Sequence, residues 1–319
     1  MLFAIITFAN SILINSHEEK SFLSWMREKN VFYVGDEYHL RLGIFITNSR
    51  FVQKFNSKKR TFKVALNKFS CYTPSEYKIL LGRFQNSRKQ ESKNNYQIFK
   101  NDIPDFVDWR EKGIVNEIKD QGDCSSCWTF GSVQACESAY ALTHGTLFSC
   151  SEQNLVDCCN TCQGCVGGFE FMALDYILNK QNGFLNSEND YPYTAKDGDK
   201  CLFDQTKGIN QIKSYVHGKK GDEIYLKELV AQGVCDIAID ATGWAFAMYS
   251  SGIYVGEECI PNYMNHAVGL VGYGTENDVD YWIVRNSFGK NWGEDGYVRM
   301  VRNDGNRCNV ASDPLQVIA

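Results

Sequence analysis

The sequence predicts an α+β fold in which a helical half of the chain precedes a half built from short strands. Residues 18–60 carry apolar side chains at helical spacing, and the run that follows Cys127 suits a buried helix. Later, residues 267–274, 281–285 and 296–301 are β-rich runs separated by glycines and Asn-Asp turns, as in an antiparallel sheet or barrel. Two such halves predict two lobes with a cleft between them, where active sites are commonly found.

The chain opens with an apolar segment that continues through Ile14. This segment is too short to span a bilayer and has the length of a secretory signal. We expect a signal peptide over residues 1–16, and no membrane anchor elsewhere. Thirteen cysteines behind such a signal indicate disulfides and a secreted or lysosome-like compartment.

Residues 18–60 are predicted to be helical. In one helical register, Phe45 and Val52 lie on a buried stripe. Glu37 and Arg41 are four residues apart and are expected to form an ion pair on the helix surface.

Residues 62–70 alternate like a strand. Thr73 and Glu76 then have the spacing of a capping box, which predicts the start of another helix. From residue 83 to residue 101 the composition turns polar, and this stretch is predicted to be a linker that proteases can reach.

Charge is distributed unevenly along the chain. Residues 1–102 carry 17 basic and 8 acidic side chains, whereas residues 103–319 carry 16 and 30, so the nets are +9 and −14. Opposite charges predict that the two parts bind each other; two independently solvated surfaces are the alternative. No nucleic-acid partner is expected, because the basic part lacks interleaved aromatic residues and the acidic part would repel phosphate.

The most specific motif is Gln121-Gly-Asp-Cys-Ser-Ser-Cys127-Trp128. His266 follows Cys127 by 139 residues, and Asn286 follows it by 159. A cysteine flanked by tryptophan, with His and Asn roughly 130–150 residues downstream, is the pattern of a thiol nucleophile and its base. Taken singly, Cys127 would be a disulfide partner, His266 a core residue and Asn286 a turn residue. Their occurrence together and in order favours catalysis.

The chemistry of such a set is acyl transfer to a thiol and then to water. At the first turn of a helix, Cys127 is exposed to the positive end of the helix dipole, and a nearby imidazolium of His266 would stabilise its thiolate. Asn286 would accept the other imidazole N–H and fix the orientation of the ring. The side-chain NH₂ of Gln121 and the backbone N–H of Cys127 would form an oxyanion hole.

At these residues the chain resembles the papain family, and within it the cathepsin L-like cysteine peptidases found in many eukaryotes, including protozoa. The resemblance covers nearly everything after the signal peptide. The motifs that carry it lie at residues 121–128, 151–158, 164–168, 191–193 and 286–293. It implies a papain-like fold with a helical left lobe and an antiparallel β-barrel right lobe, preceded by a helical inhibitory propeptide.

By this resemblance, residues 17–102 form an inhibitory propeptide of the cathepsin propeptide inhibitor type, which runs through the cleft in the reverse direction to substrate. Residues 103–319 form the mature peptidase domain. The implied function is a cysteine endopeptidase made as a secreted zymogen and acting as a monomer without a cofactor. Its partners would be protein and peptide substrates, its own propeptide and cystatin-like inhibitors. The spacing between Cys127 and His266 leaves no room for an insertion that would block the cleft, which favours an endopeptidase.

The resemblance also implies three disulfides, namely Cys124–Cys165, Cys158–Cys201 and Cys259–Cys308. Cys71 would lie in the propeptide, and no pairing is implied for Cys136, Cys150, Cys159, Cys162 and Cys235. Cys159-x-x-Cys162-x-x-Cys165 has the spacing of a metal or iron–sulfur site as well. Because an oxidising compartment favours disulfides, no metal is expected there.

Substrate would be bound by residues that match the family pattern. Gly167 and Gly168 would let an extended substrate backbone approach closely. The pocket for the second residue before the scissile bond would be lined by Phe169, Glu170, Ala238, Ala267 and Asp313, with Trp292 added to the binding set. With Asp313 at its floor and Glu170 at its rim, this pocket would accept arginine as well as leucine or phenylalanine. The alternative is that both carboxylates point to solvent.

Three departures from the family pattern matter. Phe288 stands where the family has a tryptophan that shields the His–Asn hydrogen bond, so we expect weakened but surviving activity. Asn265 replaces an aspartate before the histidine, which removes a charge that tunes the Cys–His pair. Cys71 replaces an acid in the propeptide, which weakens the case for acid-triggered loosening. The departures at Phe288 and Asn265 leave open the alternative of a catalytically impaired papain-fold binding protein. A further alternative is that the basic N-terminal region persists after cleavage at the polar linker and acts as a peptidase inhibitor.

Overall fold

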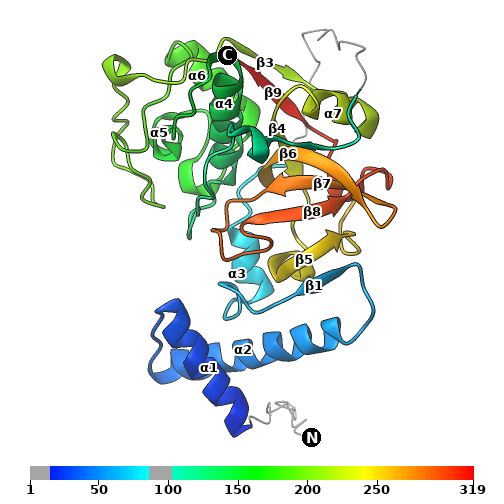
Figure 1. The fold of residues 1–319 in the computed structure, drawn as a ribbon. Coiled ribbons are helices and arrows are strands. Elements are labelled where there is room, and N and C mark those ends of the chain that lie inside the picture. The colour runs from blue at the N-terminus through cyan, green and yellow to red at the C-terminus, as the bar shows by residue number, and fades with distance from the viewer. Residues whose placement is uncertain (1–14, 86–102) are drawn as a thin grey trace, which may run out of the picture.

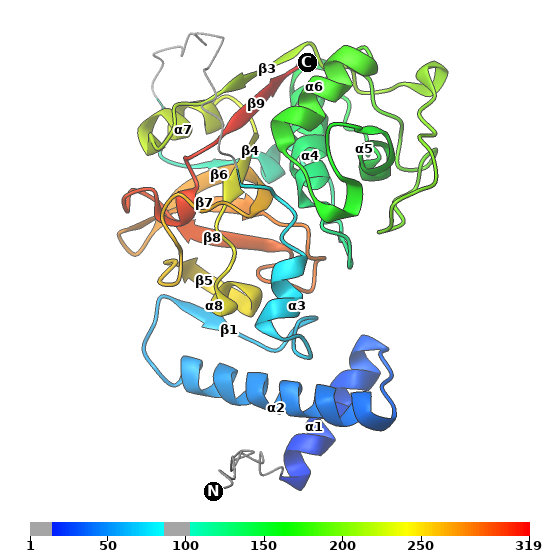
Figure 2. The ribbon, with the colours of Figure 1, turned by 180° about the vertical axis from the view of Figure 1, so that it is seen from behind.

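The computed structural model describes residues 15–85 and 103–319. The signal peptide and the polar linker predicted above fall almost wholly outside these residues. Figures 1 and 2 show residues 15–85, called here the N-terminal region, lying along one side of a body made from residues 103–319. Within the described part of the chain, no helix has the length and apolar character needed to cross a membrane.

The N-terminal region begins with two helices, α1 (Ser16–Lys29) and α2 (Gly35–Asn56). Residues 18–60 are therefore mostly helical, as predicted, but the helix is interrupted between Lys29 and Gly35. Asn30 adopts a left-handed conformation (φ 52°) and caps α1, as asparagine commonly does at a helix end. The two helices pack through a cluster of buried aromatic side chains that includes Phe22, Trp25 and Phe45. Arg41 and Glu37 approach to 3.6 Å on the surface of α2, as predicted.

The chain then forms strand β1 (Phe62–Val64) and helix α3 (Pro74–Ile79). The predicted capping box is confirmed, because Thr73 Oγ1 accepts from the Glu76 backbone and Glu76 accepts from the Thr73 N–H. The predicted strand over residues 62–70 is shorter than expected. It ends at Val64, and further along Asn67 Oδ1 accepts the Phe69 N–H at 2.9 Å, so a side-chain turn stands where the strand was expected to continue.

The helical half of the body is built around α4 (Cys127–His144), which lies between α5 (Glu152–Cys158) and α6 (Glu170–Lys180) on one side and the sheet on the other (Figure 1). Buried side chains of α4, α5 and α6 form a core of their own with Leu315 and Val317. The remaining helices of the body are α7 (Glu223–Val230) and α8 (Trp244–Ala247).

The strands form one sheet in the order β1-β5-β8-β7-β6-β4-β9-β3, with β2 paired to β6. Their bounds are β2 Val107–Asp108, β3 Ser214–His217, β4 Cys235–Ile239, β5 Tyr249–Tyr254, β6 His266–Glu276, β7 Val279–Arg285, β8 Tyr297–Val301 and β9 Leu315–Ile318. The predicted barrel is not closed, and the β5–β8 pair is parallel, so the sheet is mixed. Strand β1 of the N-terminal region extends the sheet by pairing antiparallel with β5.

This topology positions the predicted catalytic residues. Cys127 is the first residue of α4, His266 is the first residue of β6, and Asn286 follows the last residue of β7. Strands β6 and β7 pair antiparallel, and Gly269 lies opposite Arg285, so the start of β6 and the end of β7 are neighbours. The disulfides Cys124–Cys165, Cys158–Cys201 and Cys259–Cys308 are all present.

Candidate active site

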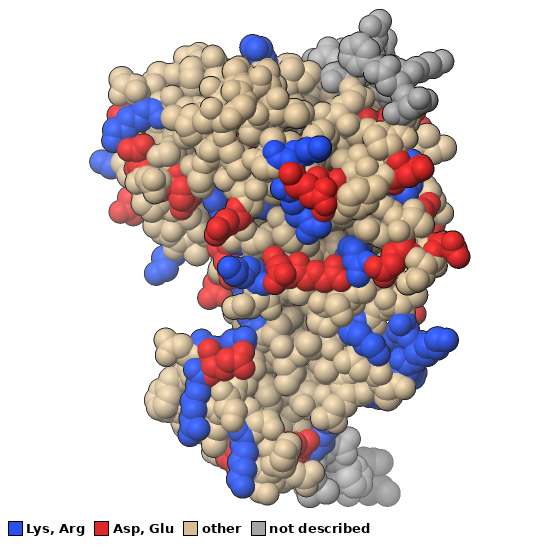
Figure 3. Space-filling model, viewed as in Figure 1, with Lys and Arg blue, Asp and Glu red and all other residues tan. Residues whose placement is uncertain are grey.

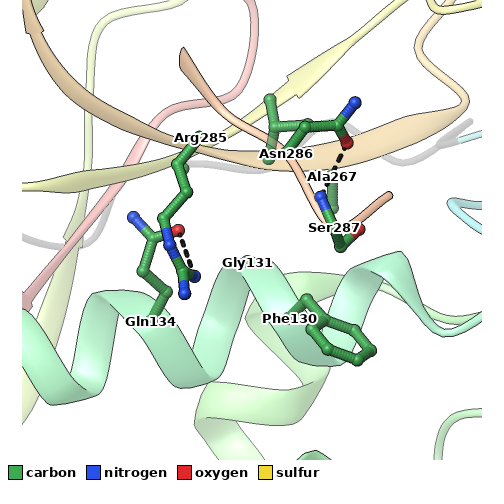
Figure 4. A pocket seen from close by; sticks show the side chains of 9 residues that line it. Phe130, Gly131, Gln134, Ala267, Arg285, Asn286 and Ser287 are labelled. Carbon is green, nitrogen blue, oxygen red and sulfur yellow. Dashed lines mark hydrogen bonds between the residues drawn. The ribbon is translucent and has the colours of Figure 1, made fainter. Parts of the chain in front are cut away.

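The predicted base and its orienting residue are in contact. His266 Nε2 lies 2.8 Å from Asn286 Oδ1, which can only accept, so Nε2 carries the proton that is donated. The same amide oxygen accepts the Ser287 N–H at 2.8 Å, which fixes the Asn286 side chain (Figure 4). The other ring nitrogen, His266 Nδ1, is buried and has no hydrogen-bond partner among the described residues. This nitrogen is therefore available to an adjacent group.

Behind these residues, α4 packs against β6, and Arg285 at the end of β7 reaches it. Arg285 extends toward Gln134 on α4, and its Nη1 donates to Gln134 Oε1 at 3.1 Å (Figure 4). The small pocket shown there is enclosed by side chains of the helix and the two strands. The side chains around this pocket support the residues that follow β7. The pocket itself is too small to hold a ligand.

Phe288 shields the His–Asn pair as predicted for that position. Its ring stacks on the His266 ring, with centroids 4.8 Å apart and an interplanar angle of 24°. It also contacts Trp292 and, from the N-terminal region, Phe69 at a centroid distance of 5.1 Å. Phe288 thus covers the base on one side and forms part of the docking surface for the N-terminal region on the other.

Burial acts on the pKa values of both predicted reactive groups. Complete burial raises the pKa of Cys127 to about 12, even though hydrogen bonds from the backbones of Ala267 and Gly82 act in the opposite direction. Burial also lowers the pKa of His266 to about 4, against the hydrogen bond to Asn286. With the N-terminal region in place, the site therefore holds a neutral thiol and a neutral imidazole.

Gln121 lies at the same site, with both ends of its amide engaged. Its Oε1 accepts from Ser287 Oγ at 2.7 Å, which orients the amide. Its Nε2 donates at 2.9 Å to the carbonyl of Cys124 and at 2.9 Å to the carbonyl of Leu80. The predicted oxyanion donor therefore already holds a carbonyl oxygen that belongs to the N-terminal region.

Residues 80–85, called here the crossing segment, pass between the helical half and the sheet half. Gly168 exchanges two backbone hydrogen bonds with this segment, one from its own N–H to Gly82 O (2.9 Å) and one to its carbonyl from Phe84 N (3.1 Å). On the other side, Arg83 N donates to Asn265 O at 3.1 Å. The pairing of the crossing segment with Gly168 is parallel.

The two predicted glycines make this close approach feasible. Gly167 has a φ of 141°, and a Cβ there would collide with the carbonyl of Gly82. A Cβ on Gly168 would lie 2.7 Å from the ring of Trp128. Larger residues at either position would push the crossing segment or the tryptophan away.

Arg83 joins the two predicted pocket acids. Its guanidinium is fully buried, with Nε 2.8 Å from Glu170 Oε1 and Nη2 in an ion pair with Asp313. It also lies over the ring of Phe169, 5.5 Å from the centroid. The alternative that both carboxylates face solvent is therefore wrong. The prediction that a linker begins at residue 83 was also wrong, because Arg83 is buried.

A third acid belongs to this cluster and was missed by sequence reasoning. Asp236 on β4 is fully buried, and burial together with the charge of Glu170 raises its pKa well above the usual range. Its Oδ2 lies 3.5 Å from Ser132 Oγ, whereas Oδ1 has no hydrogen-bond partner among the described residues. Only its place within a strand of otherwise apolar residues, Cys235–Ile239, could have drawn attention to it.

The other predicted site residues are distributed around this centre. Ala238 and Ala267 lie opposite each other in the β4–β6 pair and are both buried. Trp292 is fully buried; its Nε1 donates to Ala247 O at 3.0 Å and its ring packs against Phe288. Trp292 therefore supports the site from behind the ring that covers His266.

The side chain of Asn265 is held by the turn that follows β4. Its Oδ1 accepts the Ala241 N–H at 2.9 Å, and its Nδ2 donates to Thr242 Oγ1 at 2.8 Å. The amide thus holds the turn after β4.

The predicted attraction between oppositely charged halves is visible in specific pairs. Arg60 lies 2.6 Å from Glu257 and Lys68 lies 2.6 Å from Asp120. Acidic and basic side chains alternate in a band across the middle of the face drawn in Figure 3. Cys165 of the cysteine motif forms a disulfide with Cys124. Residues 15–85 and 103–319 contain no group of three or more His, Cys, Asp or Glu side chains placed to hold a metal ion.

Comparison with known proteins assigns the two parts of the chain separately. Residues 103–318 match the model of the papain family cysteine protease, and residues 22–77 match the cathepsin propeptide inhibitor domain. The chain belongs to the papain family of cysteine proteases. The N-terminal region is the propeptide of this protease, and the chain has the architecture of a zymogen.

Sequence similarity to curated proteases extends over nearly the whole chain. Mouse pro-cathepsin H is 39% identical over 94% of this chain and 91% of its own length. A cathepsin L-like proteinase of Fasciola hepatica is 40% identical over 90% of each. Among solved structures, the digestive procathepsin L 3 of Tenebrio molitor superposes with a TM-score of 0.87 at 35% identity, covering 96% of this chain and all of that one.

Proposed function

We propose that Cys127 is the nucleophile of an endopeptidase, with His266 as its base, Asn286 as the residue that orients the base, and Gln121 as an oxyanion donor. The observation that carries this proposal is the contact of Gln121 Nε2 with the Leu80 carbonyl, 2.9 Å away. A carbonyl from a bound peptide segment already occupies the place where a developing oxyanion would need this donor.

Removal of the propeptide would allow the reaction to begin. Once solvent reaches the site, the burial that holds both groups neutral is relieved, and the proton of the Cys127 thiol can pass to His266 Nδ1. The thiolate would then attack the scissile carbonyl, and the oxyanion would accept from Gln121 and from the Cys127 N–H. Imidazolium would protonate the leaving amine, and water would hydrolyse the thioester.

Covalent labelling by the epoxide E-64 tests this assignment on the processed protease. We expect labelling and peptide hydrolysis to disappear in Cys127→Ser, while Cys136→Ser, a substitution in the same helix, leaves both in place. Gln121→Ala should retain labelling of the thiol and lower kcat about 10²-fold or more, the usual effect of removing one oxyanion donor. An unlabelled wild-type protein would favour the rival hypothesis of an impaired binding protein.

We further propose that the pocket lined by Glu170 and Asp313 accepts arginine in the second residue before the scissile bond. Arg83 supports this, because a guanidinium fills this pocket with both carboxylates in contact and a phenylalanine ring beneath it. Without a cation, two or three acids would face one another in a buried space.

Paired fluorogenic substrates that differ only in arginine or leucine at that position test the pocket. Asp313→Ala should reduce the arginine-to-leucine ratio of kcat/KM by about tenfold or more, with Asp313→Asn as the matched control for shape. Equal ratios in wild type and Asp313→Ala would refute the proposal without affecting the assignment of Cys127.

We propose residues 1–16, 17–102 and 103–319 as signal peptide, propeptide and mature domain, in a secreted or lysosome-like compartment. The three disulfides and the apolar first residues support an oxidising route. N-terminal sequencing of the secreted and processed forms tests both boundaries.

A further inference from the structure

Two cysteines with no assigned role lie side by side in the loop after α5. Cys159 caps the end of α5, and the chain turns back so that Cys162 N donates to Cys159 O at 3.0 Å. This turn brings the two sulfurs to 2.7 Å, with a hydrogen bond from one thiol to the other. Neither residue belongs to the three disulfides.

The pair has the chemistry of a reactive dithiol. The hydrogen bond between the two sulfurs, aided by the Thr161 hydroxyl 3.4 Å away, lowers the pKa of Cys159 to about 7, against the effect of burial. The same contact raises the pKa of Cys162. One proton is therefore shared between the sulfurs and the other is readily lost near neutral pH. Cys159 is buried, but Cys162 is partly exposed and gives reagents access to the pair.

The loop that contains this pair also forms one wall of the candidate site. The Phe169 backbone hydrogen-bonds to the sulfur of Cys162, and Gln163 N donates to Gly167 O at 2.9 Å. Downstream of the pair, the loop is fixed by the Cys124–Cys165 disulfide. The state of the two sulfurs is thus connected, through a few bonds, to Gly167 and Phe169.

We propose that Cys159 and Cys162 are a site of reversible oxidation, which closes to a fourth disulfide by exchange with a low-molecular-weight disulfide such as glutathione disulfide. The thiolate of the pair attacks one sulfur of glutathione disulfide, forms a mixed disulfide and releases one glutathione. The second cysteine then loses its proton, attacks the protein-bound sulfur and releases the other glutathione. The pair loses two protons and two electrons, and glutathione disulfide is reduced to two glutathiones.

The geometry makes closure easy and the product reducible. A disulfide bond of about 2.05 Å requires the sulfurs to approach by a little over half an ångström, a change that side-chain torsions can absorb. The closed loop contains only two intervening residues, so it restricts the unfolded chain far less than the other bridges, whose partners are 41, 43 and 49 residues apart. A lowered thiol pKa further stabilises the reduced form.

The test uses the full-length proenzyme carrying Cys127→Ser, so that neither catalysis nor self-processing affects the thiols. The protein is equilibrated in glutathione buffers of increasing oxidation, alkylated, digested without reduction and mapped by mass spectrometry. We expect a 159–162 cross-link with the loss of two alkylatable thiols. We also expect the 159–162 cross-link to be reduced in less strongly reducing buffers than the three long-range disulfides.

Single variants sharpen the result. Cys159→Ser and Cys162→Ser should each abolish the cross-link and leave the remaining cysteine as a mixed disulfide with glutathione. Cys235→Ser, which removes a buried thiol in β4, should leave the transition unchanged. The proposal is overturned if both thiols remain alkylatable in the most oxidising buffer, or if the cross-link is reduced together with the other three. Because no step measures proteolysis, either outcome is independent of the catalytic assignment.

Discussion

The propeptide is held in two different ways along its length. Its first part, from α1 to α3, docks through apolar and aromatic side chains and through the added strand β1, as in the contact of Phe69 with Phe288. The crossing segment uses backbone hydrogen bonds and the buried guanidinium of Arg83. Apolar docking varies little with pH, whereas an ion pair depends on every charge around it. The two parts of the propeptide are therefore expected to respond differently to pH.

Replacing Arg83 should disturb the crossing segment most strongly. Arg83→Ala leaves Glu170 and Asp313 buried without a cation, which typically costs about 3 kcal/mol or more. We expect the fraction of proenzyme with an open site to rise roughly a hundredfold, measured as the rate of E-64 labelling at neutral pH. Arg83→Lys keeps the charge and should show a smaller rise. If Arg83→Ala labels no faster than wild type, the crossing segment is held by its backbone alone.

Phe288 tests the apolar part, because it contacts both the base and the propeptide. Phe288→Trp should increase kcat/KM of the mature enzyme by covering more of the His–Asn bond. In the proenzyme the larger ring would crowd Phe69 and Tyr77, and overpacking of this kind typically costs about 1–3 kcal/mol. Faster propeptide release together with faster turnover is the expected pattern. An unchanged turnover rate would sink the idea that this position limits activity.

Glu76 makes the stability of the first part of the propeptide depend on pH in the acid range. Burial raises its pKa, but the Thr73 backbone and the Arg41 guanidinium outweigh burial and hold the pKa below its ordinary value. Its contribution to propeptide stability is therefore complete above an unfolded pKa of about 4.3 and is lost as the pH falls through the lower folded value. Cys71, whose pKa burial raises to about 12, remains neutral throughout this range.

Glu76→Gln should consequently flatten the acid limb of propeptide unfolding. Intrinsic fluorescence of the Cys127→Ser proenzyme between pH 6 and pH 3 measures it, with Glu28→Gln as a control on the surface of α1. A variant whose acid limb has the wild-type slope would show that other carboxylates carry the dependence.

The smallest effect is expected at Lys68, whose ion pair with Asp120 is partly exposed. Surface pairs of this type contribute about 0–1 kcal/mol and are screened by salt. Lys68→Ala should change the labelling rate of the proenzyme less than about fivefold at physiological ionic strength. A change as large as that of Arg83→Ala would mean that charge, rather than apolar packing, dominates docking throughout.

Sequence reasoning predicted the parts of this protein that depend on local pattern. The capping box at Thr73 and the start of α4 at Cys127 follow from short-range preferences, and the three disulfides followed from family resemblance. Sequence reasoning failed where the environment of a residue is determined by partners that are distant in the chain. Arg83 looked like the first residue of a polar linker because its partners, Glu170 and Asp313, are far away in the chain.

The same limit applies to the sheet and to the charges of the site. Nothing local to β5 and β8 shows that they pair in parallel and leave the sheet open. The ion pair expected from Cys127 and His266 depends on solvent, and only the folded chain shows that the crossing segment excludes it.

The burial of Cys127 and His266 also determines how the zymogen reacts with thiol reagents. The neutral thiol and neutral imidazole of the covered site hold two protons, one on Cys127 Sγ and one on His266 Nε2, and a thiolate–imidazolium pair would hold two as well, both on the ring. Uncovering the site therefore relocates a proton without taking one up. Electrophiles that need a thiolate should therefore pass over the stored proenzyme and react only after the crossing segment has left. Such a reagent, applied to intact cells or secretions, would count the molecules in which the crossing segment has left the site, independently of any cleavage of the chain.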